Sequence, residues 1–249
     1  MYQFFIEDEN AAEDFVTIEG SDVNHIKNVL RMKPGEKIRV CTRSGQNYFC
    51  SISDVAESFV RADILEKEAE STELPCRIYL FQGLPKNDKM EWIIQKTVEL
   101  GVYEVIPVAM KNCVVKLDDK KAKSKVTRWQ AIAESAAKQS KRSLIPEVKM
   151  PMSYKEAVAY AKELDVKLVP YENEHGMAGT KAAMEQIKKG ESIAVFIGPE
   201  GGFAPEEIAL VQDEMQLISL GKRILRTETA GIAALAILGY RLESSDMIE

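Results

Sequence analysis

Two loops near the C-terminal end of the sequence carry residues that suit the binding of a small molecule. The first is IGPEGGF, residues 197–203, which follows the apolar run at 193–197. Its glycines permit positive φ angles and let a ligand approach the backbone closely. The stretch is neither a G-x-G-x-x-G fingerprint nor a G-x-x-x-x-G-K-[ST] loop, so those dinucleotide and nucleoside triphosphate sites are disfavoured. A purely structural turn is the alternative interpretation.

The second loop is LGKRILRTETA, residues 220–230, which also follows an apolar run. Thr227 or Thr229 could cap the helix that begins there. Arg226 stands just before that helix, where the helix dipole disfavours a cation, and this favours a functional role for Arg226. In open α/β sheets ligands bind beyond the carboxyl ends of the strands, so the two loops could line one pocket.

Basic residues gather in two other stretches. Residues 111–142 hold ten Lys or Arg against three Asp or Glu, although the whole chain has a net charge of −6. The stretch ends with Gln139 and Arg142, and the earlier stretch HIKNVLRMKPGE, residues 25–36, adds further cations. Such clustering predicts a local anion-binding surface, and a solvated lysine-rich loop is the alternative.

Two kinds of secondary-structure pattern divide the chain into residues 1–72 and 73–249. The first part holds short β-rich runs and one short helical stretch, which predicts a small barrel-like β domain. The second part alternates strands with helices, one of them at about 122–140, and predicts an α/β fold with a mostly parallel sheet. Its last helix, from residue 227, is apolar on nearly every side and should be buried in the core or against a second subunit.

The composition excludes several classes of protein. No apolar run reaches the ~18 residues of a membrane-spanning helix, and the acidic start does not resemble a secretory signal. The four cysteines form no Cys-x-x-Cys pair and there are two histidines, so we expect neither a metal site nor a disulfide framework. We therefore expect a cytoplasmic protein without membrane or metal.

Five motifs, taken in order, resemble one family. They are HxxxVLRxxxGE from residue 25, KxxELGV from 96, QSxRxxxPEV from 139, IGPEGGF, and LGxRILRTETA from 220. Together they are similar to the 16S rRNA uridine-N3 methyltransferases of the RsmE type, within the knotted SPOUT superfamily. The resemblance covers nearly the whole chain.

The resemblance implies both an architecture and a cofactor. It implies a PUA-like RNA-binding β-barrel followed by a SPOUT α/β domain with a trefoil knot, in a homodimer whose active site lies near the subunit boundary. It also implies S-adenosylmethionine as the methyl donor, held by three loops. Those loops map here to Val169, Pro170 and Tyr171, then to Ile197, Gly198, Pro199, Glu200, Gly201 and Gly202, and then to Leu220, Gly221, Ile224, Leu225, Arg226 and Thr229.

The reaction implied is methylation of N3 of one uridine, equivalent to uridine 1498, in the 16S rRNA of the small ribosomal subunit. Arg226 or Arg142 could stabilise the negative charge that develops on the base, because arginine itself stays protonated. Glu228, Glu200 or a water could accept the N3 proton. The residues expected to bind RNA are His25, Lys27, Arg31, Lys86, Lys120, Lys121, Lys123, Gln139 and Arg142.

Two positions depart from the family pattern. Ala204 stands where the family has a capping Ser or Thr, and Lys138 stands where we expect Glu. Two other functions are open at this point. One is a non-catalytic rRNA-binding factor in ribosome assembly on the same scaffold, and the other is an α/β enzyme that binds a small anionic metabolite.

Overall fold

The computed structural model describes residues 1–68, 71–174 and 176–244. The chain divides into two compact units. The first comprises Met1–Glu73 together with Ala137–Ile145, and the second comprises Leu74–Ala136 together with Pro146–Glu249. The segment 137–145 therefore belongs to the first unit although it follows 63 residues of the second in the sequence.

A curled sheet of five strands forms most of the first unit. The strands are β1 (Tyr2–Ile6), β2 (Phe15–Glu19), β3 (Lys37–Thr42), β4 (Asn47–Val55) and β5 (Phe59–Glu68), in the order β1-β3-β4-β5-β2. The edge strands β1 and β2 contact each other, so the sheet curls around one core. Alternate side chains such as Phe4, Ile38 and Ile52 fill that core. This confirms the barrel-like β domain.

A short helical insertion lies between β2 and β3. It consists of α1 (Ser21–Asn24) and a π-helix (His25–Leu30), preceded along the chain by the 3-10 turn Asp8–Asn10. Its side chains Val23 and Ile26 are buried in the core of the first unit. Arg31 ends the π-helix in the left-handed conformation, with φ of 55°. Because π-helices are rare and gather at functional sites, this insertion is a place to look for binding residues.

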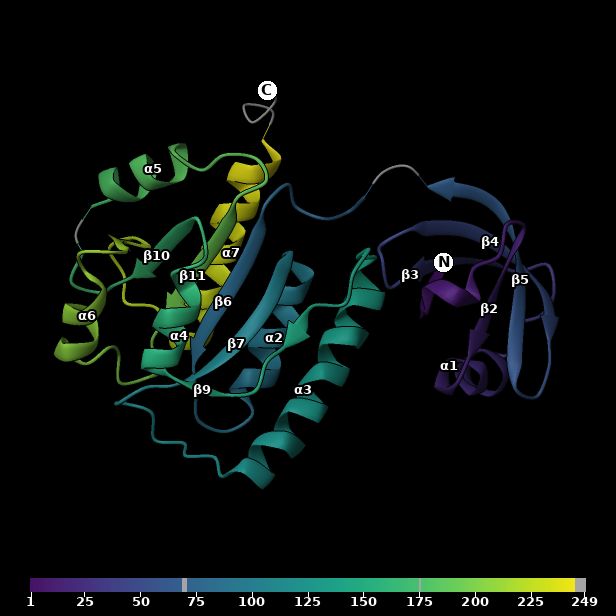
Figure 1. Ribbon diagram of the computed structural model, residues 1–249, viewed down its shortest axis with the longest axis horizontal. Helices are drawn as coiled ribbons and strands as arrows, with labels where there is room; N and C mark the ends of the chain where they lie inside the picture. The colour runs from purple at the N-terminus through teal and green to yellow at the C-terminus, as the bar shows by residue number, and fades with distance from the viewer. Residues whose placement is uncertain (69–70, 175, 245–249) are drawn as a thin grey trace. The chain divides into compact units, whose positions relative to one another are not determined.

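A parallel sheet of seven strands forms the centre of the second unit (Figure 1). Its order is β12-β10-β11-β6-β7-β8, and β9 pairs with β7. The strands are β6 (Arg77–Gly83), β7 (Val102–Ala109), β8 (Glu147–Val148), β9 (Met152–Ser153), β10 (Val166–Pro170), β11 (Ser192–Ile197) and β12 (Gln216–Ile218). The parallel α/β sheet is as predicted, although β8 and β9, with two residues each, are too short to leave a sequence pattern.

Helices cover both faces of this sheet. They are α2 (Lys89–Glu99), α3 (Asp119–Ser140), α4 (Tyr154–Ala161), α5 (Ala178–Glu185), α6 (Pro205–Val211) and α7 (Thr227–Glu243). Helices α2 and α7 pack against each other, and α7 also packs on β11 and β6, while α4 packs on β7 from the other face (Figure 1). No helix among the described residues is both long enough and apolar enough to span a membrane.

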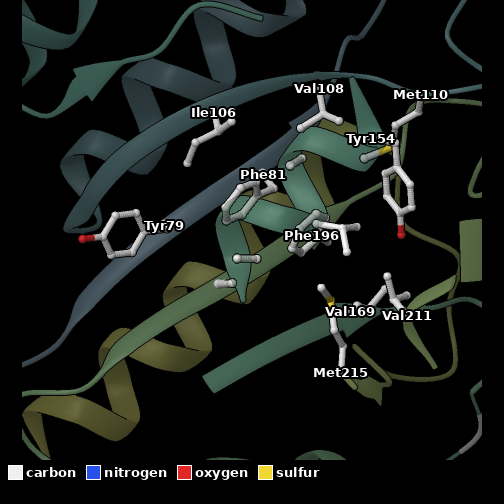
Figure 2. Packing of buried hydrophobic residues seen from close by; sticks show 14 of the residues in the cluster. Tyr79, Phe81, Ile106, Val108, Met110, Tyr154, Val169, Phe196, Val211 and Met215 are labelled. Atoms are coloured by element: carbon white, nitrogen blue, oxygen red, sulfur yellow. The ribbon is translucent and has the colours of Figure 1, made fainter. Parts of the chain in front are cut away.

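Aromatic side chains fill the core between the sheet and helix α4 (Figure 2). Phe81 on β6 and Phe196 on β11 stand opposite each other in register, and their rings stack at 4.3 Å between centroids. Tyr154 of α4 contacts Phe196 edge-on at 6.1 Å. This packing holds β6 and β11 in register, so that both strands end at the same edge of the sheet. It therefore positions the loops that follow them.

Helix α7 is only partly buried within this chain. Leu235 and Leu238 are fully buried, whereas Tyr240 is 81% exposed. The core of the single chain therefore accounts for one face of this apolar helix and leaves the other open.

Candidate active site

A cavity of about 780 Å³ opens where three neighbouring strands of the parallel sheet end. Its walls are the chain segments that follow β10, β11 and β12. Pockets of this volume hold small molecules in many proteins, and the carboxyl edge of a parallel sheet is where they lie in α/β folds. The two loops singled out in the sequence thus form one pocket, together with a third.

Twelve of the fifteen residues expected to bind the cofactor line this cavity. They are Pro170, Tyr171, Ile197, Gly198, Pro199, Glu200, Gly202, Leu220, Gly221, Ile224, Leu225 and Arg226.

The other three expected residues do not line it. The side chain of Val169 is fully buried in the core beside α4, because successive strand residues alternate between faces. Thr229 is exposed on α7. At Gly201 an added Cβ would lie 2.9 Å from Cβ of Asn112, and the Asn112 amide donates a hydrogen bond to the Gly201 carbonyl at 3.0 Å. Gly201 therefore faces Asn112, on the side of the loop away from the cavity.

Two glycines keep the 198–203 loop close to its neighbours. Gly202 has φ of +66°, a conformation that favours glycine. Gly83, at the end of β6, has no room for a side chain, because an added Cβ would lie 2.7 Å from the backbone nitrogen of Pro199. The loop is thus seated directly on the end of the central strand. Gly83 closes an apolar strand in the sequence, but nothing there showed that it faces this loop.

An ion-pair cluster that the sequence did not reveal joins two walls of the cavity. The Lys89 ammonium, at the start of α2, lies 3.0 Å from the Glu200 carboxylate and 3.2 Å from that of Glu228. All three side chains are about a quarter exposed or less. Glu200 also accepts a hydrogen bond from the backbone N–H of Lys86 at 3.1 Å.

These contacts set the charge of the cluster. Burial would raise the pKa of Glu200, but the hydrogen bonds from Lys89 and from backbone N–H groups outweigh burial and hold that pKa below its usual value. The hydrogen bond to Glu200, followed by the ion-pair contact with Glu228, raises the pKa of Lys89. At neutral pH Glu200 is therefore ionised and Lys89 is protonated.

Three cations lie on the loop after β12. Lys222, Arg223 and Arg226 all line the cavity, and each side chain is exposed. None of them forms an ion pair within the described part of the chain. Lys222 and Arg223 were visible in the sequence as a basic pair in this loop, but only the structure places them on the cavity wall beside Arg226.

The start of α7 differs from the capping that we expected. Arg226 occupies the N-cap position, and no side chain caps the helix, so the prediction of Thr227 or Thr229 as the cap is wrong. The Thr227 hydroxyl instead donates a hydrogen bond to the Gly198 carbonyl at 2.6 Å. That long-range bond replaces the local one because Gly198 lies within reach only in the folded sheet.

The expected RNA-binding residues of the first unit fall into two groups. His25, Lys27 and Arg31 are exposed on the π-helix and at its end, and Gln139 is exposed as well. Arg142 is only 4% exposed and its guanidinium binds the Glu73 carboxylate through two nitrogens. Arg142 is therefore committed to an internal ion pair of the first unit.

The departure at Lys138 has a local explanation. The Lys138 ammonium binds both carboxylate oxygens of Asp22, at 2.9 and 3.0 Å, within the first unit. At the other departure, Ala204, the N-cap of α6 has no side-chain acceptor. The carboxylate of Glu207 reaches back to the Ala204 N–H at 2.8 Å, and it also accepts from the Lys111 N–H at 2.8 Å. Half of a capping box is thus retained, which offsets part of the loss.

The basic stretch at 111–142 is largely neutralised by ion pairs. At least six of its ten cations face a carboxylate, namely Lys111, Lys121, Lys125, Arg128, Lys138 and Arg142. Lys120 and Lys123 are exposed and make no ion pair with any residue that the structure describes, whereas Lys121 lies 3.4 Å from Asp118. The excess of +7 therefore overstates the charge that this stretch offers to a ligand.

Comparison with known proteins places this architecture in a family. A profile described as an RNA methyltransferase domain matches residues 72–239, and one described as an RNA methyltransferase PUA domain matches residues 18–65. The ribosomal RNA small subunit methyltransferase E of Bacillus subtilis is 39% identical over 98% of both chains. That of Mesomycoplasma hyopneumoniae is 36% identical over 93% of this chain and 96% of its own.

Solved structures agree with the sequence relatives. The ribosomal RNA small subunit methyltransferase E of Neisseria gonorrhoeae, bound to S-adenosylmethionine, matches with a TM-score of 0.84 and 31% identity over 96% of this chain and 97% of its own. A methyltransferase of Legionella pneumophila in complex with the same cofactor matches with a TM-score of 0.83 and 30% identity, over 96% and 97% of the two chains. The chain thus belongs to the ribosomal RNA small subunit methyltransferase E family of RNA methyltransferases.

Proposed function

We propose that this protein transfers the methyl group of S-adenosylmethionine to N3 of a uridine in small-subunit ribosomal RNA. The observation that carries the proposal is the cavity at the strand ends, lined by twelve residues that the family resemblance assigns to the cofactor. Relatives that match nearly the whole chain are solved with S-adenosylmethionine bound.

The lining of the cavity suits the two ends of such a cofactor. Ile197, Leu220 and Leu225 supply apolar surface for an adenine ring. Gly198 and Gly202 leave the backbone accessible, and an added Cβ at Gly198 would lie 3.3 Å from Gly202 and Phe203 of the same loop. When bound, the sulfonium supplies an activated methyl group, so the protein's main contribution is to position the acceptor.

The chemistry at uridine N3 requires a cation and a proton acceptor. In the transfer the N–H bond of N3 breaks, an N–CH₃ bond forms and the S–CH₃ bond breaks, so one proton must leave. Arg226 lines the cavity without an ion pair among the described residues, and it is our choice for stabilising charge on the uridine oxygens. Arg142 is held by Glu73, and we assign it to the structure of the first unit.

We assign the role of proton acceptor to Glu200 or Glu228, directly or through water. Lys89 contacts both, so the two carboxylates share one ammonium. Glu200 lines the cavity itself. Because N3 is on the pairing edge of the base, the uridine must be unpaired when it enters.

We further propose that the exposed polar residues His25, Lys27, Arg31, Lys86, Lys120, Lys121, Lys123 and Gln139 contact RNA phosphates and sugars. Their exposure and the PUA domain match support this assignment. Phosphate contacts position RNA without reading its sequence, so base selection belongs to the cavity.

The assembly proposed is a knotted homodimer in the cytoplasm. Tyr240 on α7 is 81% exposed and Ile224 on the cavity loop is 84% exposed, which leaves apolar surface for a second subunit. Helix α7 follows the edge strand β12 but packs on β11 and β6, a path compatible with a trefoil knot. Sedimentation of the wild type beside Tyr240→Glu tests the dimer.

One experiment tests the proposed activity. The protein is incubated with methyl-labelled S-adenosylmethionine and either small ribosomal subunits or their free RNA. We expect label in the RNA and a reverse-transcription stop at a single uridine, because a methyl on N3 blocks pairing. RNA binding without transfer would favour the assembly factor, and neither binding nor transfer would favour an enzyme for a small anionic metabolite.

A further inference from the structure

A buried chain of hydrogen bonds runs under the cavity and takes no part in the chemistry described above. The amide of Gln82, on the central strand β6, donates to the Thr227 hydroxyl at 2.9 Å. The same amide nitrogen donates to the Gly83 carbonyl at 3.1 Å. The Thr227 hydroxyl in turn donates to the Gly198 carbonyl at 2.6 Å.

The direction of this chain is fixed by the groups in it. A carbonyl only accepts, so Thr227 must give its single hydroxyl proton to Gly198. The hydroxyl can then only accept from Gln82, whose two amide hydrogens are both used, on Thr227 and on Gly83. One orientation of the Gln82 amide therefore allows one orientation of the Thr227 hydroxyl.

The chain joins two segments that line the cavity to the end of the central strand β6. Gly198 is the first residue after β11 and Thr227 begins α7, and both line the cavity. Gly83 supports Pro199 from below. Helix α7 comes close enough for this because residue 231 is glycine, where an added Cβ would lie 3.3 Å from the Gln82 side-chain oxygen.

Burying the Gln82 amide at this position costs free energy of folding. Its side chain is completely buried, and its amide oxygen has no hydrogen-bond partner in the part of the chain that the structure describes. An apolar side chain of similar size would avoid that desolvation cost. A residue that stabilised only the fold would thus be better replaced by methionine or leucine.

We propose that Gln82 is a positioning residue that acts through Thr227 to hold the Gly198 carbonyl and the start of α7 in the geometry that binds S-adenosylmethionine. The inference rests on the proposed function, because it concerns the affinity of the same cavity.

The test measures S-adenosylmethionine affinity by calorimetry and unfolding by denaturant in the full chain. Gln82→Met and Thr227→Val should each weaken the affinity by roughly tenfold, as expected for loss of an orienting hydrogen bond. Thr227→Ser, which keeps the hydroxyl, should stay within about twofold of wild type. The double variant Gln82→Met/Thr227→Val should bind S-adenosylmethionine no more weakly than the single variant with the lower affinity. Both changes break the same chain of hydrogen bonds, so their effects should not add.

Thr97→Val is the matched control. Thr97 is also fully buried, and its hydroxyl bonds the Ile93 carbonyl at 2.8 Å within α2 and does not line the cavity. This variant should bind the cofactor like wild type.

Three results overturn the inference. They are wild-type affinity in both single variants, additive losses in the double variant, and an affinity loss that appears only with a matching loss of stability. If the wild type does not bind S-adenosylmethionine, the proposed function fails first and the inference fails with it.

Discussion

Replacing Lys89 with methionine should destabilise the second unit by about 2 kcal/mol at neutral pH. The change keeps most of the side-chain volume but removes the ammonium that faces Glu200 at 3.0 Å and Glu228 at 3.2 Å. Exposed ion pairs contribute about 0–1 kcal/mol, and breaking a buried pair costs about 3–5 kcal/mol. The side chains of these two pairs are about a quarter exposed, so each pair should contribute roughly 1 kcal/mol to the free energy of unfolding, near the range for exposed pairs.

The loss should depend on pH in a defined direction. The lowered pKa of Glu200 gives stability that is present above its unfolded value of 4.5 and disappears as the pH falls through the lower folded value. The raised pKa of Lys89 gives stability that is present below 10.5 and disappears as the pH rises through the higher folded value. The difference between wild type and variant should therefore be largest between these limits and shrink at both ends.

Denaturant unfolding at several pH values measures this difference, beside the control Lys162→Met. Lys162 also faces a carboxylate, Glu214 at 3.2 Å, but both side chains are more than half exposed. The control should lose less than about 0.5 kcal/mol. Equal losses in the two variants, or a Lys89→Met loss that stays constant down to pH 3, would refute the reasoning.

Three further changes probe the proposed site. Arg226→Ala should lower turnover by roughly 10²–10³-fold in the methyl-transfer assay with little change in cofactor affinity, and a loss confined to affinity would reassign Arg226 to binding. Gly201→Val should weaken S-adenosylmethionine binding in calorimetry while RNA binding persists, because the new side chain meets Asn112 at 2.9 Å, and normal affinity would contradict this. A triple glutamine variant replaces Lys120, Lys121 and Lys123. In a salt titration of RNA affinity its slope should be shallower by ~0.7–0.9 for each phosphate that a lysine no longer neutralises, whereas an unchanged slope would mean solvated lysines.

Local sequence patterns predicted most of the secondary structure. The five strands of the first unit and the strand–helix alternation of the second follow from side-chain periodicity, which each segment carries by itself. The long helix predicted at about 122–140 begins earlier, at Asp119. Strands β8 and β9 were missed because two residues give no periodicity, and they exist only through their pairing with β7.

The site was predictable where its residues belong to loops that directly follow buried strands. The glycines at 198 and 202 and the loop around Arg226 were found this way, because parallel strands bring their carboxyl ends to one edge. Lys89 was missed, since its partners Glu200 and Glu228 are more than 100 residues away in the sequence. Charge clustering was misleading for Arg142, because a count along the chain does not see Glu73.

The sequence by itself determined the class of fold, the loops that line the cavity and the family to which the chain belongs, because these depend on short motifs and on local periodicity. Only the tertiary structure decided which polar groups meet. It set the Thr227 hydroxyl on Gly198 rather than on its own helix, and it placed the Gln82 amide beneath both. Hydrogen bonds and ion pairs act over about 3 Å, so their partners are fixed by how distant segments pack and not by their spacing along the chain.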